Sequence, residues 1–175
     1  MKTFKKSILV LMAVVAVSLT SCKKDDDGGD DPQGGSGTFT AKVDGNNFSG
    51  MQGTVVARVT NSGAGQAIAI SGGTEQSENL QIILTSFDGE GSYDLNFVNI
   101  GTYSYLPDPS NPDPNTVVVY STVGTGQGNN GTINISSYDG NTIKGTFNFT
   151  GYNLNNTSES VSVTDGQFNI EVTNQ

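Results

Sequence analysis

The sequence predicts an all-β protein, an antiparallel β-sandwich of about ten short strands that follows a disordered N-terminal tether. Apolar residues recur at every second position in many short runs, which is the period of a half-buried strand. Asp-Gly pairs stand between several of these runs, and no stretch of the folded part has the 3.6-residue apolar period of a helix. Because so many short strands must protect their edges, a partly closed β-barrel is the alternative architecture.

The strands expected in the first half of the domain are separated by turn residues and by a polar segment at residues 72–79. Their alternating apolar residues are, in chain order, Phe39, Ala41 and Val43; Phe48 and Met51; Val55, Ala57 and Val59; Ile68 and Ile70; Leu80, Ile82 and Leu84; and Tyr93, Leu95 and Phe97, which are expected to share one face.

The second half continues this pattern. Its alternating residues are Val117 and Val119, opposite in face to Val118 and Tyr120; Ile133 and Ile135; Ile143, Phe147 and Phe149; Val161 and Val163; and Phe168, Ile170 and Val172. We expect hairpin turns at the Asp-Gly pairs 44–45, 88–89, 139–140 and 165–166, since Asp and Gly tolerate the positive φ of a type I′ turn. Gly145, inside a strand, predicts a bulge or a close backbone approach.

Residues 1–21 are interpreted as a signal peptide. Lys2, Lys5 and Lys6 precede an unbroken apolar run at residues 8–17. Ten helical residues span about 15 Å, half of a ~30 Å hydrocarbon core, so a cleaved signal fits better than a permanent membrane helix. The run ends in Leu19-Thr20-Ser21-Cys22, which resembles a bacterial lipobox. That resemblance implies that Cys22, the single cysteine, carries a lipid anchor.

Residues 22–37 contain no apolar side chain longer than proline after the cysteine, so we expect a flexible acidic and Gly-rich tether. Lys24, Asp25 and Asp26 resemble the surface-export signal of lipoproteins from the Bacteroidetes group. The resemblance implies an outer-membrane lipoprotein displayed at the cell surface, and the periplasmic face of the outer membrane is the alternative location. Residues 38–175 then form a single all-β domain.

Composition excludes several function classes. The chain has no His and one Cys, which excludes Ser-His-Asp and Cys-His catalysis and His-ligated metal sites. With a formal net charge of −9, it is not expected to bind nucleic acid. We therefore expect a monomeric, non-catalytic domain.

If the domain binds a ligand, we expect the site to include Tyr103, Tyr105 and the loop at residues 106–115. The prolines of this loop stiffen it, and a stiff loop loses less entropy on binding. They are Pro107, Pro109, Pro112 and Pro114, and the candidate hydrogen-bond acceptors are Asp108, Asn111, Asp113 and Asn115. Asp108 and Asp113 are also candidate calcium ligands, because calcium is bound by oxygen atoms alone; no other cofactor is expected. A solvated turn and two core tyrosines are the competing interpretation.

Four short motifs resemble a family of small Bacteroidetes lipoproteins whose all-β domain has no known activity. They are the opening hairpin at residues 39–48, Gly91-Ser92-Tyr93-Asp94-Leu95, the Gly-Thr-Phe strand at residues 143–149, and the closing hairpin at residues 163–168. The resemblance implies a lipid-anchored β domain without supplying a function. Two classes remain open: a binding module for a glycan, peptide or protein, and a structural envelope component, with a calcium-stabilised adhesion domain as a third alternative.

Overall fold

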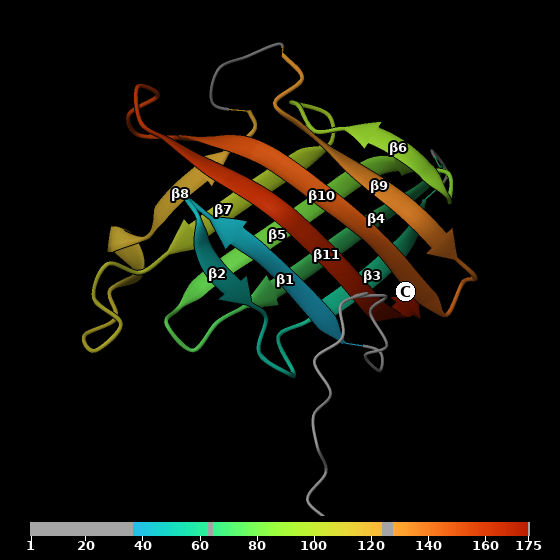
Figure 1. Ribbon diagram of the computed structural model, residues 1–175, viewed down its shortest axis with the longest axis horizontal. Helices are drawn as coiled ribbons and strands as arrows, with labels where there is room; N and C mark the ends of the chain where they lie inside the picture. The colour runs from blue at the N-terminus through green and yellow to red at the C-terminus, as the bar shows by residue number, and fades with distance from the viewer. Residues whose placement is uncertain (1–36, 63–64, 124–127, 175) are drawn as a thin grey trace, which may run out of the picture. The chain divides into compact units, whose positions relative to one another are not determined.

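The computed structural model describes residues 37–62, 65–123 and 128–174. The predicted all-β class is confirmed, and the described residues form eleven strands and one turn of 3₁₀ helix (Figure 1). The elements are β1 (Thr38–Val43), β2 (Asn46–Ser49), β3 (Val56–Ser62), β4 (Gly65–Gly73), β5 (Glu78–Phe87), β6 (Gly91–Asp94), β7 (Ile100–Tyr105), η1 (Pro114–Thr116), β8 (Val118–Ser121), β9 (Gly131–Tyr138), β10 (Thr142–Asn153) and β11 (Ser160–Asn174).

All eleven strands belong to one sheet in the order β2-β1-β11-β3-β4-β5-β7-β8-β10-β9-β6. β10 also pairs with β11. The strands β11, β3, β4, β5, β7, β8 and β10 therefore form a closed ring. The pairs are antiparallel except β11 with β3, which is parallel, so the sheet is mixed where the sequence predicted a purely antiparallel one. In Figure 1, β1, β11, β10 and β9 form one layer that crosses over β3, β4, β5 and β7, which gives the two-layer arrangement of a sandwich.

β10 and β11 are the longest strands, and each pairs with two strands in succession along one of its edges. β11 pairs first with β1 and then, at Val172, with β3. β10 pairs with β9 through Phe149 and then, from Tyr152, with β8. Each long strand therefore joins the two layers at a corner, as strands that change sheets do in sandwiches.

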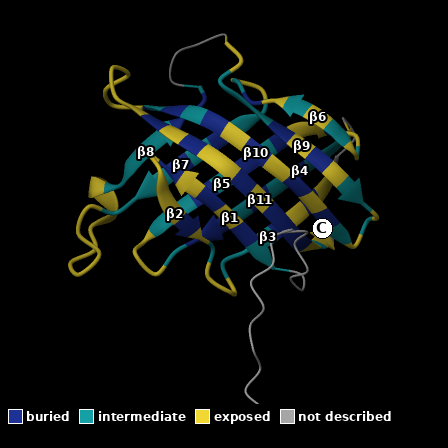
Figure 2. Ribbon diagram, viewed as in Figure 1, coloured by how far each residue is buried: buried dark blue, intermediate teal, exposed yellow. Residues whose placement is uncertain are grey.

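The core lies between the two layers and is built from the alternating residues. Buried and exposed positions alternate along β10 and β1, as Figure 2 shows. Phe39 stacks on Phe147 with ring centroids 5.1 Å apart, and Phe48 and Phe168 pack around this pair. Each such side chain contributes about 1.5–3 kcal/mol when it is fully buried, so burial of the four rings favours folding by roughly 6–12 kcal/mol before the entropy cost of ordering them.

Two of the four Asp-Gly pairs make the predicted hairpin turns. Asp44 and Gly45 both have positive φ, 48° and 82°, as a type I′ turn between β1 and β2 requires. Asp139 and Gly140 join the paired strands β9 and β10, although only Gly140 has positive φ there.

The pair Asp88-Gly89 does not close a hairpin, contrary to the prediction. It leads from β5 to β6, and β6 pairs with β9 instead. Phe87, just before the pair, packs against Tyr138 of β9 with ring centroids 4.9 Å apart. Phe87 thus already contacts β9, the strand with which β6 pairs after the chain leaves β5.

The pair Asp165-Gly166 is a bulge inside β11 rather than a turn. Asp165 has φ 52°, and the pairing register of β11 shifts here against both β1 and β10. A Cβ atom on Gly166 would lie 2.5 Å from the carbonyl oxygen of Phe147. β11 continues through the bulge because it is paired with β1 on one side and with β10 on the other.

The prediction for Gly145 is confirmed in both of its parts. The register between β9 and β10 shifts between Lys144 and Gly145, and a Cβ atom on Gly145 would lie 2.2 Å from the carbonyl oxygen of Asn134. The predicted shared face at residues 93–97 is wrong at Phe97. The chain turns at Asn96, whose side chain accepts a hydrogen bond from the Val98 amide, and Phe97 is 57% exposed.

The predicted signal peptide, the lipid anchor at Cys22 and the export signal lie outside the described residues. Within the described residues, no helix has the length and apolar character needed to cross a membrane.

Candidate functional site

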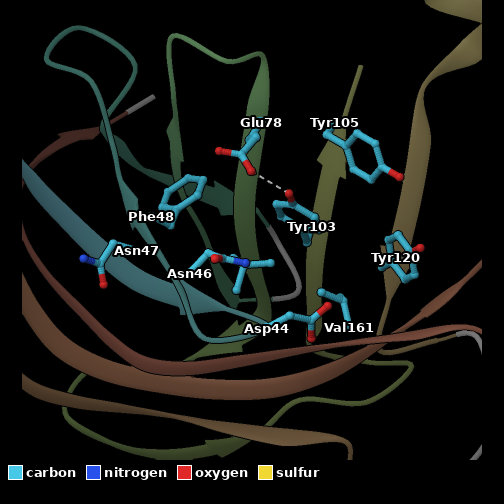
Figure 3. Close-up of a pocket in the computed structure, with 10 residues that line it drawn as sticks. Asp44, Asn46, Asn47, Phe48, Glu78, Tyr103, Tyr105, Tyr120 and Val161 are labelled. Carbon is cyan, nitrogen blue, oxygen red and sulfur yellow. Dashed lines mark hydrogen bonds between the residues drawn. The ribbon is translucent and has the colours of Figure 1, made fainter. Parts of the chain in front are cut away.

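A pocket with a volume of about 210 Å³ lies where the β1–β2 hairpin meets the starts and ends of the strands in the other layer (Figure 3). A hollow of this size suits a small chemical group. The residues that line it are Val43, Asp44, Asn46, Asn47, Phe48, Glu78, Tyr103, Tyr105, Tyr120 and Val161.

Three tyrosines form one wall of this pocket. Tyr103 on β7 is directly opposite Tyr120 on β8 in the strand register, and Tyr105 follows two residues later on the same face. The ring centroid of Tyr103 lies 5.9 Å from that of Tyr105 and 6.3 Å from that of Tyr120. Tyr103 is 7% exposed, whereas Tyr105 and Tyr120 are half-buried, so the wall runs from the core towards solvent.

Glu78, at the start of β5, is tied to this wall. The Tyr103 hydroxyl donates to Glu78 Oε1 at 2.7 Å, and the Thr74 hydroxyl donates to Oε2 at 3.0 Å. Burial, followed by the hydrogen bond to Glu78 and its negative charge, raises the pKa of Tyr103 well above its usual range. The Tyr103 hydroxyl is therefore a neutral donor that fixes the carboxylate in place.

Asp44 supplies a second carboxylate from the β1–β2 turn. The Ser162 amide donates to Asp44 Oδ1 at 2.8 Å, and the Asp44 amide donates to the Ser162 carbonyl at the same distance. These bonds clamp the turn onto β11. Burial raises the pKa of Tyr120, and the neighbouring Tyr105, Glu159 and Asp44 raise it further, whereas a hydrogen bond with Asn153 opposes the shift.

A second hollow, with a volume of about 290 Å³, is lined by residues around Val55, Val56 and Ile170. Glu171 is its single charged residue and it contains no aromatic ring. It therefore offers fewer specific contacts than the tyrosine pocket.

The structure separates the two halves of the predicted site. Tyr103 and Tyr105 line the pocket, but Asp108, Asn111, Asp113 and Asn115 do not. Tyr103 is buried, as the interpretation of a core tyrosine expected. Tyr105 is half-buried, which is closer to the interpretation of an accessible binding residue.

The loop carboxylates make hydrogen bonds within their own turns. Asp108 Oδ1 accepts from the Ser110 hydroxyl at 2.6 Å, and this bond lowers the pKa of Asp108. Asp113 Oδ1 accepts from the Asn115 amide and side chain at 2.9 and 2.8 Å. In the described part of the chain, no three acidic, His or Cys side chains are grouped so that they could hold a metal ion. Calcium binding by Asp108 and Asp113 stays a prediction.

Sequence reasoning missed Glu78 and Tyr120 and assigned Asp44 to a turn alone. Asp44 does form that turn, but its carboxylate also faces the pocket (Figure 3). Glu78 and Tyr120 come together because β5, β7 and β8 are adjacent, while β6, between β5 and β7 in the sequence, pairs elsewhere. Asp44 joins them from the β1–β2 turn, which hydrogen bonds to Ser162 hold against β11. For Tyr120 the sequence offers one indication, the strand alternation that places its side chain on the same face as Val118 and opposite to Val119.

Fold and pocket together define an all-β domain with an acidic, tyrosine-lined pocket at one end of two crossed layers. The chain belongs to the family described as a domain of unknown function, DUF6252, whose model matches residues 35–170. All ten residues that line the pocket fall within that match. No curated protein matches the chain, and no solved structure matches it either.

Proposed function

We propose that the chain is a lipid-anchored cell-envelope protein whose β domain is a non-catalytic binding module for a glycan, peptide or protein. The observation that carries the binding function is the tyrosine pocket. Tyr105 and Tyr120 present half-exposed rings, which offer an apolar face and a hydroxyl group, next to two fixed carboxylates.

The anchor is supported by the position of Cys22 at the end of a lipobox-like segment, residues 19–22, that closely follows an apolar run too short for a membrane span. Each buried methylene of an acyl chain contributes roughly 0.8 kcal/mol, so two or three chains hold a protein firmly at a membrane. Cys22→Ala should shift the protein from the detergent phase to the aqueous phase, or leave an uncleaved precursor. Partitioning identical to that of the wild type would contradict the anchor.

Surface display is supported by the resemblance of Lys24, Asp25 and Asp26 to an export signal. Replacing Asp25, Asp26 and Asp27 by Ala should reduce protease accessibility on intact cells without changing membrane fractionation. A wild-type protein that is never accessible on intact cells would favour the periplasmic face.

A monomeric, non-catalytic role without nucleic acid is supported by charge, composition and sheet edges. The chain lacks His, and its net charge of −9 repels phosphate. Its sheet ends in β2 and β6, two strands of four residues each, which offer little backbone for pairing with another copy.

Array binding tests the site. The full chain, purified in a non-ionic detergent, is applied to glycan and peptide arrays beside the double variant Tyr105→Ala, Tyr120→Ala. Tyr152→Ala is the matched control, since Tyr152 is a half-buried tyrosine on β10 that does not line the pocket. Signals lost in the double variant and kept in the control support the proposal, provided that both variants melt cooperatively. Signals that survive in the double variant would overturn it.

A further inference from the structure

We propose that the tyrosine pocket takes an alkylammonium group, carried by a small organic amine or by a lysine side chain. This inference rests on the proposed binding function and names the chemistry of the ligand. It follows from the charge of the pocket, its aromatic wall, its free hydrogen-bonding atoms and its size.

The charge of the lining is negative and has no counter-charge. Asp44 and Glu78 line the pocket, and no lysine or arginine does. The three cationic side chains in the described part of the chain are Lys42, Arg58 and Lys144. Lys42 follows the alternation of β1 to the outer face and pairs with Asp165 at 2.9 Å. A cation that enters the pocket therefore meets two carboxylates without displacing a residue of the protein.

The aromatic wall suits the same group. The face of a tyrosine ring attracts a cation, and such sites recognise quaternary ammonium groups and methylated lysine. The ring centroid of Tyr103 lies 5.9 and 6.3 Å from those of its two neighbours, so the three rings pack as one cluster. Tyr105 and Tyr120 are its more exposed members. Phe48 and Val161 add apolar contacts for methyl or methylene groups. A bare metal ion would gain nothing from these contacts.

At least two polar atoms of the lining remain free to bind the ligand. Ser162 occupies only Oδ1 of Asp44, and no hydrogen bond among the described residues uses Oδ2. The hydroxyl of Tyr105 likewise has no hydrogen-bond partner among the described residues. Glu78, in contrast, is held by Tyr103 and Thr74 and acts chiefly through its charge. An N–H of a primary, secondary or tertiary ammonium can thus bond to Asp44, whereas a quaternary group such as that of choline is attracted by its charge alone. In both cases the carbon substituents face the rings.

Matched charged and neutral probes test the proposal by calorimetric titration of the full chain in non-ionic detergent. Choline is compared with 3,3-dimethyl-1-butanol, its neutral isostere, and N-acetyl-lysine methylamide with the norleucine analogue. The proposal expects at least one charged probe to bind with a Kd at least tenfold below that of its neutral partner. Binding of choline alone identifies a small organic amine, and binding of the lysine compound identifies a peptide. Equal Kd values within both pairs, or no binding by either charged probe, would overturn the inference.

Charge variants locate the site. Asp44→Asn keeps the acceptor for Ser162 and tolerates positive φ, and Glu78→Gln keeps an acceptor for Tyr103, so both preserve the packing. Each should raise the Kd of the charged probe about tenfold, whereas Asp113→Asn, in the loop outside the pocket, should leave it unchanged. If only Asp113→Asn weakens binding of the charged probe, the site lies in the loop and the proposal is wrong.

The array experiment keeps the two proposals distinguishable. If neutral glycans bind in a pocket-dependent manner while both charged probes fail, the binding module stands and the ammonium inference is wrong. If no array signal depends on Tyr105 and Tyr120 and no probe binds, both are wrong.

Discussion

Tyr103 stands where the core ends and the pocket begins. Its ring is buried among core residues, and its hydroxyl reaches Glu78 at the pocket wall. The residue therefore has a structural role as well as a place in the site. Tyr105, two residues later, has the same side-chain chemistry with less burial and no hydrogen bond to another described residue.

These differences predict different stabilities for two matched variants. Tyr103→Phe removes a hydrogen bond to a charged acceptor and should lower the free energy of unfolding by about 1–2 kcal/mol. Tyr105→Phe should change it by less than about 0.5 kcal/mol. Urea unfolding of both variants measures the difference, and equal effects would contradict the assigned role of the Tyr103–Glu78 bond.

The raised pKa of Tyr103 predicts a pH dependence. A pKa that is higher in the folded state than the ordinary tyrosine value of about 10 means that folding holds the proton more tightly. The contribution of the Tyr103 proton to the free energy of unfolding is therefore fully present below about pH 10, and it is lost as the pH rises towards the folded-state pKa. Between pH 10 and 12, the wild type should lose more stability than Tyr103→Phe. If the free energy of unfolding falls with pH in parallel for the two proteins, folding does not raise the pKa of Tyr103.

At the scale of the elements, local signals were predictable and partner choice was not. The alternation of β10 and the type I′ turn at Asp44-Gly45 depend on neighbouring residues, and both could be predicted from the sequence. The same dipeptide at Asp165-Gly166 became a bulge because β1 and β10 hold β11 from both sides. The sequence around that dipeptide contains no information about those neighbours.

The close approach at Gly145 gives a prediction at this scale. In Gly145→Ala the new methyl group meets the backbone oxygen of Asn134, which cannot rotate away as a side chain could. The variant should lose about 2 kcal/mol or more of unfolding free energy. Gly128→Ala is the control, since its Cβ would meet no atom closer than 3.7 Å and its change should stay within about 0.5 kcal/mol. Similar melting temperatures for the two variants would be incompatible with this geometry.

For the molecule as a whole, the parallel pair of β11 with β3 closes the ring of strands. The sequence favoured antiparallel hairpins, and a pairing between residues more than 100 positions apart has no local signal. The same limit applies to the pocket. Tyr103 and Tyr105 could be selected from their spacing, but Glu78, Asp44 and Tyr120 depend on how distant strands meet.

Deletion of residues 172–175 removes this closure and predicts a measurable opening. The loss of the β11–β3 hydrogen bonds and of the partly buried Val172 should lower the free energy of unfolding by at least about 2 kcal/mol. Hydrogen exchange should become faster in β3, while β9, which is paired on both sides by β6 and β10, should stay protected. Unchanged exchange in β3 would mean that the parallel pair does not hold the ring closed.

The central claim is that the tyrosine pocket is where this protein meets its ligand. The most direct test is hydrogen exchange of the full chain with and without the array component that binds most tightly. We predict slower exchange at the β1–β2 turn and along β7 and β8, whose residues line the pocket. Protection confined to the loop at residues 106–115, or to strands that do not reach the pocket, would contradict the claim.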